Sequence, residues 1–234
     1  MCTVTFLPDP QGGFILTSNR DEIILREKAE IPVVRKIDNQ KIIFPRDPKG
    51  GGTWIALSEK GRAVCLLNGA FEPHVSAASY AKSRGLVVLE SFRSEKAGDF
   101  FNQYSFEGVE PFTLLLTERK ELWELRWDGK RKHILQLDSS RPGIWASVTL
   151  YPEEIRNKRE RWFNSWLTQN DFSVESIRRF HRFGGEGDQR NDVVINRDNR
   201  MLTQSITSIV FSQNQNAQVI YEDLLENKTY LTGF

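Results

Sequence analysis

Long apolar segments and targeting signals are missing from this sequence. No run of eighteen apolar residues occurs, and the N-terminus has neither the basic start nor the hydrophobic core of a signal peptide. We therefore expect no insertion into a membrane and a location in the cytoplasm.

Cysteine and histidine are also scarce. The chain has two cysteines and three histidines, which is too few for a disulfide framework. Their spacing fits no zinc motif, so we expect neither a metal nor another cofactor. Of the two cysteines, Cys65 lies in the apolar stretch 63–67 and is expected to be a buried, inert thiol.

An excess of charge of one sign is absent as well. Lys and Arg together number 32 and Asp and Glu number 31, so no overall field attracts nucleic acid or an anionic membrane. Apolar residues make up 39% and aromatic residues 11%, as in globular proteins. Because no repeat, low-complexity tract or linker interrupts the chain, we expect residues 1–234 to form one domain.

The first twenty-two residues carry the clearest pattern. Apolar residues alternate along 2–6 and again along 14–16, and the segment 8–13 between them is rich in Pro, Asp and Gly. This pattern predicts an antiparallel hairpin. In such a hairpin the residue that starts the first strand lies beside those that end the second. The expected neighbours of Cys2 are therefore Asn19, Arg20 and Asp21.

This grouping suits an N-terminal nucleophile. If Met1 is removed, the α-amine of Cys2, with a pKa of about 7.7–8, can take the proton of its own thiol. Arg20 would favour the thiolate, and Asp21 could hold the amine. Alternatively, Cys2 is an ordinary strand residue, and Arg20 and Asp21 form a surface ion pair at a strand exit.

For three further features between residues 45 and 70, namely a run of glycines, Trp54 and Asn68, we compare a functional with a structural interpretation. The glycines 50–52 do not form a phosphate loop, because no Gly-Lys-Ser or Gly-Lys-Thr follows; we expect a turn that allows close backbone approach. Trp54 belongs either to the core or to a pocket wall. Asn68, before Gly69, forms either a turn or the amide donor to an oxyanion.

Four short motifs stand out, namely Met-Cys-Thr-Val at 1–4, Thr-Ser-Asn-Arg-Asp-Glu at 17–22, Gly-Gly-Thr-Trp-Ile-Ala at 51–56 and Leu-Leu-Asn-Gly at 66–69. Together they resemble the NRDE family, also called the transport and Golgi organization 2 family. Ser-Ile-Thr at 205–207 resembles the family's late strand. The family in turn resembles N-terminal nucleophile hydrolases with an N-terminal cysteine, such as choloylglycine hydrolase and penicillin V acylase.

The resemblance implies an α+β fold, a four-layer αββα sandwich that cleaves non-peptide amide bonds. It assigns Cys2 as the nucleophile, Arg20 and Asp21 as the residues flanking it, and Asn68 as an oxyanion donor. Two positions depart from the pattern. Ser147 or Thr149 stands where related acylases use a second asparagine, and Gln204 stands where many relatives have arginine. The missing arginine argues against a bile-acid-like or other carboxylate substrate.

The rest of the chain predicts strands interrupted by two helical blocks, which suits stacked antiparallel sheets with helices outside. Helices are expected at 76–92, 96–104, 152–167 and 173–183. Strands are expected at 112–117, 121–127, 132–137, 193–195, 202–211 and 218–221.

Two functional hypotheses follow from the sequence. The first is a cysteine N-terminal nucleophile amidohydrolase that cleaves a non-peptide C–N bond of a small acylated substrate through a Cys2 thioester. In it Asn19, Trp54, Ser147 and Gln204 are the expected substrate-binding residues. The second is a non-enzymatic protein of the same fold that binds a lipid, acyl-coenzyme A or haem.

Overall fold

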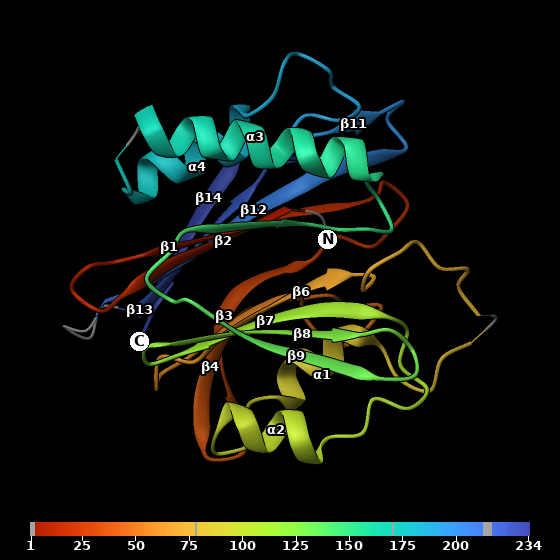
Figure 1. Ribbon diagram of the computed structural model, residues 1–234, viewed down its shortest axis with the longest axis vertical. Helices are drawn as coiled ribbons and strands as arrows, with labels where there is room; N and C mark the ends of the chain where they lie inside the picture. Colours follow the sequence, from red (N-terminus) through yellow and green to blue (C-terminus); the bar gives the residue numbers. More distant parts are fainter. Residues whose placement is uncertain (1–2, 78, 170, 213–216) are drawn as a thin grey trace.

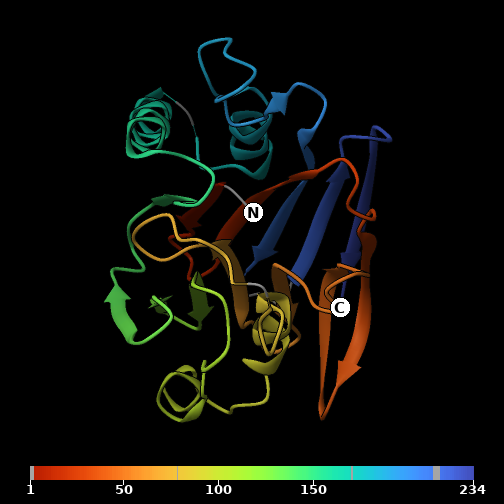
Figure 2. The ribbon, with the colours of Figure 1, turned by 90° about the vertical axis from the view of Figure 1, so that its right-hand side faces the viewer.

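Two antiparallel sheets stack face to face and carry helices on their outer sides (Figure 1, Figure 2). The structure is a computed structural model that describes residues 3–77, 79–169, 171–212 and 217–234. Helices α3 and α4 cover one sheet, and α1 and α2 cover the other, which gives the expected four layers of an α+β sandwich (Figure 1).

The first sheet has the strand order β10-β1-β2-β12-β13-β14, with β11 paired to β12. Its strands are β1 (Thr3–Pro8), β2 (Phe14–Ile23), β10 (Gly143–Ala146), β11 (Asn196–Arg197), β12 (Met201–Phe211), β13 (Ala217–Asp223) and β14 (Lys228–Gly233). Its helices are α3 (Glu153–Gln169) and α4 (Val174–Phe183).

The second sheet runs in sequence order from β3 to β9. Its strands are β3 (Glu30–Ile37), β4 (Gln40–Arg46), β5 (Ile55–Ser58), β6 (Ala63–Asn68), β7 (Phe112–Glu118), β8 (Glu121–Trp127) and β9 (Lys132–Leu137). Its helices are α1 (Arg84–Glu90) and α2 (Ala97–Gln103).

Strand β2 is buried on both faces, because one face meets the second sheet and the other meets the helices. Phe14 and Leu16 pack in the core between the sheets, whereas Ile15 packs with residues of α3 and α4. Successive side chains of a strand point to opposite faces. The two candidate site residues that follow one another in this strand, Arg20 and Asp21, therefore face different layers.

The N-terminal hairpin forms as the sequence predicts. β1 pairs with β2 in a register that sets Thr3 opposite Asn19, and β1 pairs on its other side with β10, where Thr3 faces Ala146. Cys2 lies outside the described residues. The expected burial of Cys65 is confirmed, and burial raises the pKa of its thiol to about 12.

Two expected elements are wrong. The helix expected at 76–92 is reduced to α1, because residues 81 and 82 pair with another segment: Ala81 N donates to Gly108 O, and Lys82 bridges Val109. The Ser83 side chain then caps the helix. The strand expected at 193–195 does not form, because Val193 N donates to Gly184 O and Ile195 N donates to the Thr203 hydroxyl; only Ile195 O bonds to the backbone of β12, where it accepts from Thr203 N. β14 lies in the C-terminal tail, for which no strand is expected.

The glycine-rich loop after β4 makes the close approach that the sequence predicts. A Cβ atom on Gly52 would lie 2.1 Å from the carbonyl carbon of Gly85. Next to this contact, Thr53 N donates to Gly85 O over 3.1 Å. Only a residue without a side chain lets the loop pack directly on the start of α1.

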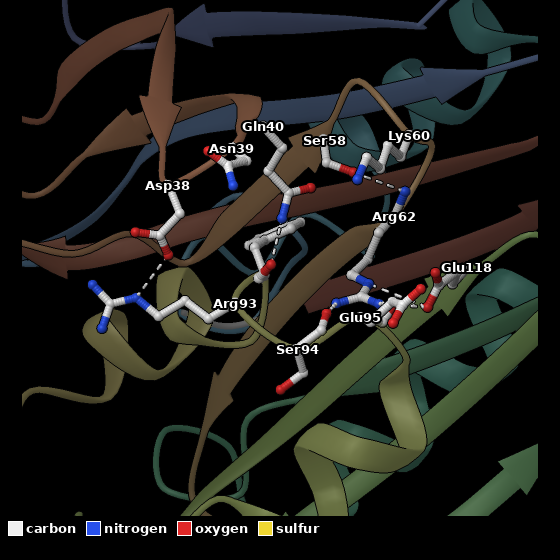
Figure 3. A pocket seen from close by; sticks show the side chains of 11 residues that line it. Asp38, Asn39, Gln40, Ser58, Lys60, Arg62, Arg93, Ser94, Glu95 and Glu118 are labelled. Atoms are coloured by element: carbon white, nitrogen blue, oxygen red, sulfur yellow. Dashed lines mark hydrogen bonds and ion pairs between the residues drawn. The ribbon is translucent and has the colours of Figure 1, made fainter.

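Arg62 ties the segment after α1 to the second sheet, beside a hollow of about 240 Å³ (Figure 3). Its guanidinium donates to the carbonyl oxygens of Ser91, Ser94 and Glu95 and to the Glu118 carboxylate, at 2.7–3.2 Å. Because these bonds use its five N–H donors, this buried cation has nothing left to offer a ligand. The Arg62 side chain is therefore a structural clamp.

We expect Arg62→Met to lower the free energy of unfolding by about 3–5 kcal/mol, because it leaves Glu118 and three carbonyl oxygens without their partner. Urea denaturation measures the loss. Arg93→Met is the matched control, since Arg93 borders the same hollow but its ion pair with Asp38 is exposed. We expect that variant to change stability by less than about 0.5 kcal/mol. Equal effects of the two substitutions would contradict the clamp.

Candidate active site

A small cavity of about 110 Å³ lies where β2, β6 and the glycine-rich loop meet. It is lined by Arg20, Glu22, Arg26, Asp47, Thr53, Trp54, Leu66, Asn68, Ser83, Arg84 and Gly85. The cavity therefore joins three of the residues singled out from the sequence, namely Arg20, Trp54 and Asn68. Cavities that enclose a drug-sized ligand measure about 300–1,000 Å³, so this one suits a reacting group more than a whole substrate.

Arg20 is the buried cation of this cavity. Its guanidinium lies over the Trp54 ring, 5.0 Å from the ring centroid, and donates to the side-chain oxygen of Gln204. Burial lowers the pKa of the guanidinium, and the nearby Glu22 and Asp47 carboxylates partly offset this effect. Within the described part of the chain, Arg20 forms no ion pair with a carboxylate. A buried cation at a cavity wall, without a carboxylate in direct contact, favours an anion or a developing negative charge inside the cavity.

Gln204 owes its position to a bulge in β12. The pairing of β12 with β2 shifts between Thr203 and Ser205, which leaves Gln204 as the extra residue. Its side chain accepts from Arg20 and donates to Ile23 O over 3.3 Å. Gln204 thus contacts the site through Arg20.

Asn68 is the last residue of the central strand β6 and is held there by the segment after β10. The Ser147 hydroxyl donates to Asn68 O over 2.9 Å and lies 3.1 Å from the Thr149 hydroxyl. The next residue, Gly69, has φ of +82°, and a Cβ atom on it would lie 2.4 Å from Val148 Cγ2. Glycine at this position therefore lets the end of β6 pack against the segment after β10.

Asp21 and Asn19 lie on the other face of β2, toward the helices. Asp21 accepts from the Tyr151 hydroxyl and, over 2.5 Å, from the Thr203 hydroxyl. The Asn19 amide donates to His181 O at 3.1 Å and Val193 O at 2.8 Å. Neither side chain lines the cavity that contains Arg20, so the expected group of residues is divided between two faces of one strand.

Comparison with family models gives one match, Transport and Golgi organisation 2, over residues 1–227. The chain belongs to this family. A comparison with curated proteins finds no match.

Solved structures similar to this member of the Transport and Golgi organisation 2 family share its fold at low sequence identity. Penicillin V acylase from Agrobacterium tumefaciens aligns with a TM-score of 0.58 and 9% identity, over 100% of this chain and 86% of that one. A variant of conjugated bile acid hydrolase from Clostridium perfringens aligns with a TM-score of 0.62 and 11% identity, over 98% and 92%.

A Caenorhabditis elegans N-acylethanolamine-hydrolyzing acid amidase ortholog aligns with a TM-score of 0.53 and 13% identity, over 89% of this chain and 92% of that one. The family member therefore has the N-terminal nucleophile hydrolase fold, as the sequence resemblance implies. None of its described helices is long and apolar enough to cross a membrane. Nor do three His, Cys, Asp or Glu side chains gather as a metal site within the described ranges.

The residues that sequence reasoning missed in this family member lie under the helix-facing side of β1 and β2. They are Tyr151, Arg159 and His181, all buried. A signal for one of them exists: Arg159 lies four residues from both Ile155 and Phe163, on the apolar face of α3. A charge on a buried face is informative because burying it is costly.

His181 is neutral, and its contact with Asn19 fixes its tautomer. Its Nδ1 lies 2.5 Å from Asn19 Oδ1, an acceptor only, so Nδ1 donates. Its Nε2 then accepts from the Thr5 hydroxyl at 2.8 Å. Burial, together with the charges of Arg178 and Arg159, lowers the pKa of His181 to about 3.

We expect His181 to make the protein less stable in mild acid. The unfolded chain takes up a proton near pH 6.5, whereas the folded protein does so only near pH 3, so stability falls as the pH falls through this window. The loss between pH 7 and pH 5 should be about 2 kcal/mol. Urea denaturation at both pH values measures it. His181→Gln, which cannot titrate, should show a dependence smaller by that amount, and an unchanged dependence would contradict a neutral His181.

Proposed function

We propose that this protein is a cysteine N-terminal nucleophile amidohydrolase that cleaves a non-peptide C–N bond in a small acylated substrate. The observation that carries the proposal is the cavity lined by buried Arg20 and half-buried Asn68, close to the start of β1. Thr3 pairs with Asn19 and Ala146, whose chain neighbours are Arg20 and Ser147. Cys2 is bonded to Thr3, and consecutive Cα atoms lie about 3.8 Å apart.

The reaction begins after Met1 has been removed. The α-amine of Cys2 accepts the thiol proton, and the sulfur attacks the carbonyl carbon of the substrate, so that a C–S bond forms and the carbonyl oxygen becomes an oxyanion. The Asn68 amide donates to this oxyanion. When the C–N bond breaks, the leaving amine takes the proton from the α-ammonium and a thioester remains. Water, deprotonated by the α-amine, then releases the carboxylic acid and restores the thiol.

Arg20 and Asp21 have separate parts in this proposal. Arg20, buried beside the cavity, stabilises the thiolate by its positive charge. Asp21, held by Tyr151 and Thr203, orients the α-amine. Because Ser147 already donates to Asn68 O, its contribution is to hold Asn68 in place.

The fold and the names of the similar proteins support the reaction class. They are an acylase, a hydrolase of conjugated bile acids and an acid amidase, and they share this fold with TM-scores of 0.53–0.62. The small volume of the cavity restricts the enclosed part of the substrate to the reacting group. Arg20 is hydrogen-bonded to the neutral side chain of Gln204. Because residue 204 is not an arginine, it offers no second guanidinium to a substrate carboxylate.

We expect exposure to a β-lactone to add one acyl group to the wild-type protein, on Cys2, in molecules that have lost Met1. The Cys2 sulfur attacks the lactone carbonyl as it would attack an amide carbonyl. The ring then opens, and the acyl group remains attached to the sulfur. Intact mass and peptide mapping measure the adduct. Cys2→Ala should give none, whereas Cys65→Ala should keep it because Cys65 is buried. Retained Met1 with no adduct would contradict the proposal.

We expect Asn68→Ala to slow acylation of Cys2 by the lactone by about 100- to 1,000-fold, because the oxyanion loses a donor. Alkylation of the same thiol by iodoacetamide forms no oxyanion and should keep its rate. The two rates, measured by mass spectrometry over time, separate the loss of the donor from a general loss of reactivity. Asn102→Ala, at an exposed position of α2, is the control. A parallel loss of both rates would count against the assigned role.

A further inference from the structure

Arg159 is a completely buried cation in α3 whose role the fold alone does not explain. Its side chain is 0% exposed, and no carboxylate among the described residues forms an ion pair with it. It donates to the carbonyl oxygens of Asn191 at 3.2 Å and Asp192 at 2.5 Å. Its Nε has no hydrogen-bond partner in the described part of the chain. A buried charge with neutral partners costs stability.

The first contact of interest joins Arg159 to the start of β1. Its guanidinium donates to the Thr3 hydroxyl, which is also completely buried. Thr3 is the first described residue of β1 and is bonded to Cys2. The contact spans 156 positions of sequence, and it fixes the strand end at the point where the nucleophile begins.

The second contact leads to Asp21. The Arg159 guanidinium stacks on the Tyr151 ring, 3.6 Å from its centroid, and Arg197 lies on the same ring at 5.2 Å. Held by these two cations, Tyr151 donates its hydroxyl to the Asp21 carboxylate. One side chain thus contacts the residue after Cys2 and also supports the ring that binds Asp21.

We propose that Arg159 is a positioning residue for the N-terminal nucleophile, setting Cys2 through Thr3 and the Asp21 carboxylate through Tyr151. This inference rests on the proposed function. Arg159 touches neither substrate nor the reacting atoms in this account. It keeps the amine-binding carboxylate and the nucleophile in register from the helix-facing side of the sheet, opposite the cavity.

The charged and titratable groups around this point come from five segments. They are Arg20 and Asp21 on β2, Tyr151 before α3, Arg159 on α3, His181 on α4 and Arg197 on β11. The Asp21 carboxylate favours the α-ammonium form of Cys2, whereas the Arg159 charge at Thr3 disfavours it and so helps to keep the general base free at neutral pH. Removing the Arg159 charge should move the pH midpoint of acylation upward, which a purely structural residue would not do.

The test compares lactone acylation of Cys2 across pH in Thr3→Val, Arg159→Met and Arg159→Lys, each rate being normalised to the folded fraction. Thr3→Val removes only the hydroxyl contact, and should slow acylation about 10- to 100-fold, since misplacement by about 1 Å costs up to 100-fold. Arg159→Met should do the same and raise the pH midpoint. Arg159→Lys keeps the charge without the planar fork, so the midpoint should stay while the rate falls.

Arg161→Met, at an exposed position of the same helix, is the matched control and should behave as the wild type does. Rates in Thr3→Val within twofold of the wild type overturn the proposal, whatever Arg159→Met does, because the route through Thr3 is then absent. A wild-type protein that forms no adduct on Cys2 overturns the proposed function and this inference together. A reactive wild type matched by all three variants overturns only the role of Arg159.

Discussion

The pairing of β2 with β1 on one side and β12 on the other determines the candidate site. Because β2 is buried on both faces, each of its polar side chains must find a partner within the protein. Arg20 finds Gln204 and the Trp54 ring between the sheets, and Asp21 finds Tyr151 and Thr203 beneath the helices. The alternation of one strand therefore distributes a cation and an anion to the two sides of the sheet.

Much of this arrangement could be predicted from local sequence. The turn residues at 8–13 and the alternation on both sides define the hairpin, and they set Thr3 opposite Asn19. Asn68 at the end of a central strand and the close approach of Gly52 also follow from short patterns. These features depend on hydrogen bonding and sterics within a few residues, so short stretches of sequence predict them.

Other features depend on partners that are remote in the chain. The contact between Arg20 and Gln204 requires the register of β2 with β12 and the bulge beside Ser205, neither of which has a local signal. The helix expected at 76–92 shortens because Ala81 and Lys82 bond to residues 108 and 109. Tertiary pairing overrides helix propensity here, as it does generally where the two compete.

Two buried arginines lie near the start of β1 on opposite faces of the first sheet. Arg20 lies between the sheets, and Arg159 lies beneath α3. Neither forms an ion pair with a carboxylate among the described residues. An apolar side chain of similar size would usually stabilise the fold at least as well. Stability alone therefore gives no reason for charge at these two positions. Chemistry at the strand start between them does, because a thiolate, an oxyanion and a free amine are all favoured by fixed positive charge that water cannot screen.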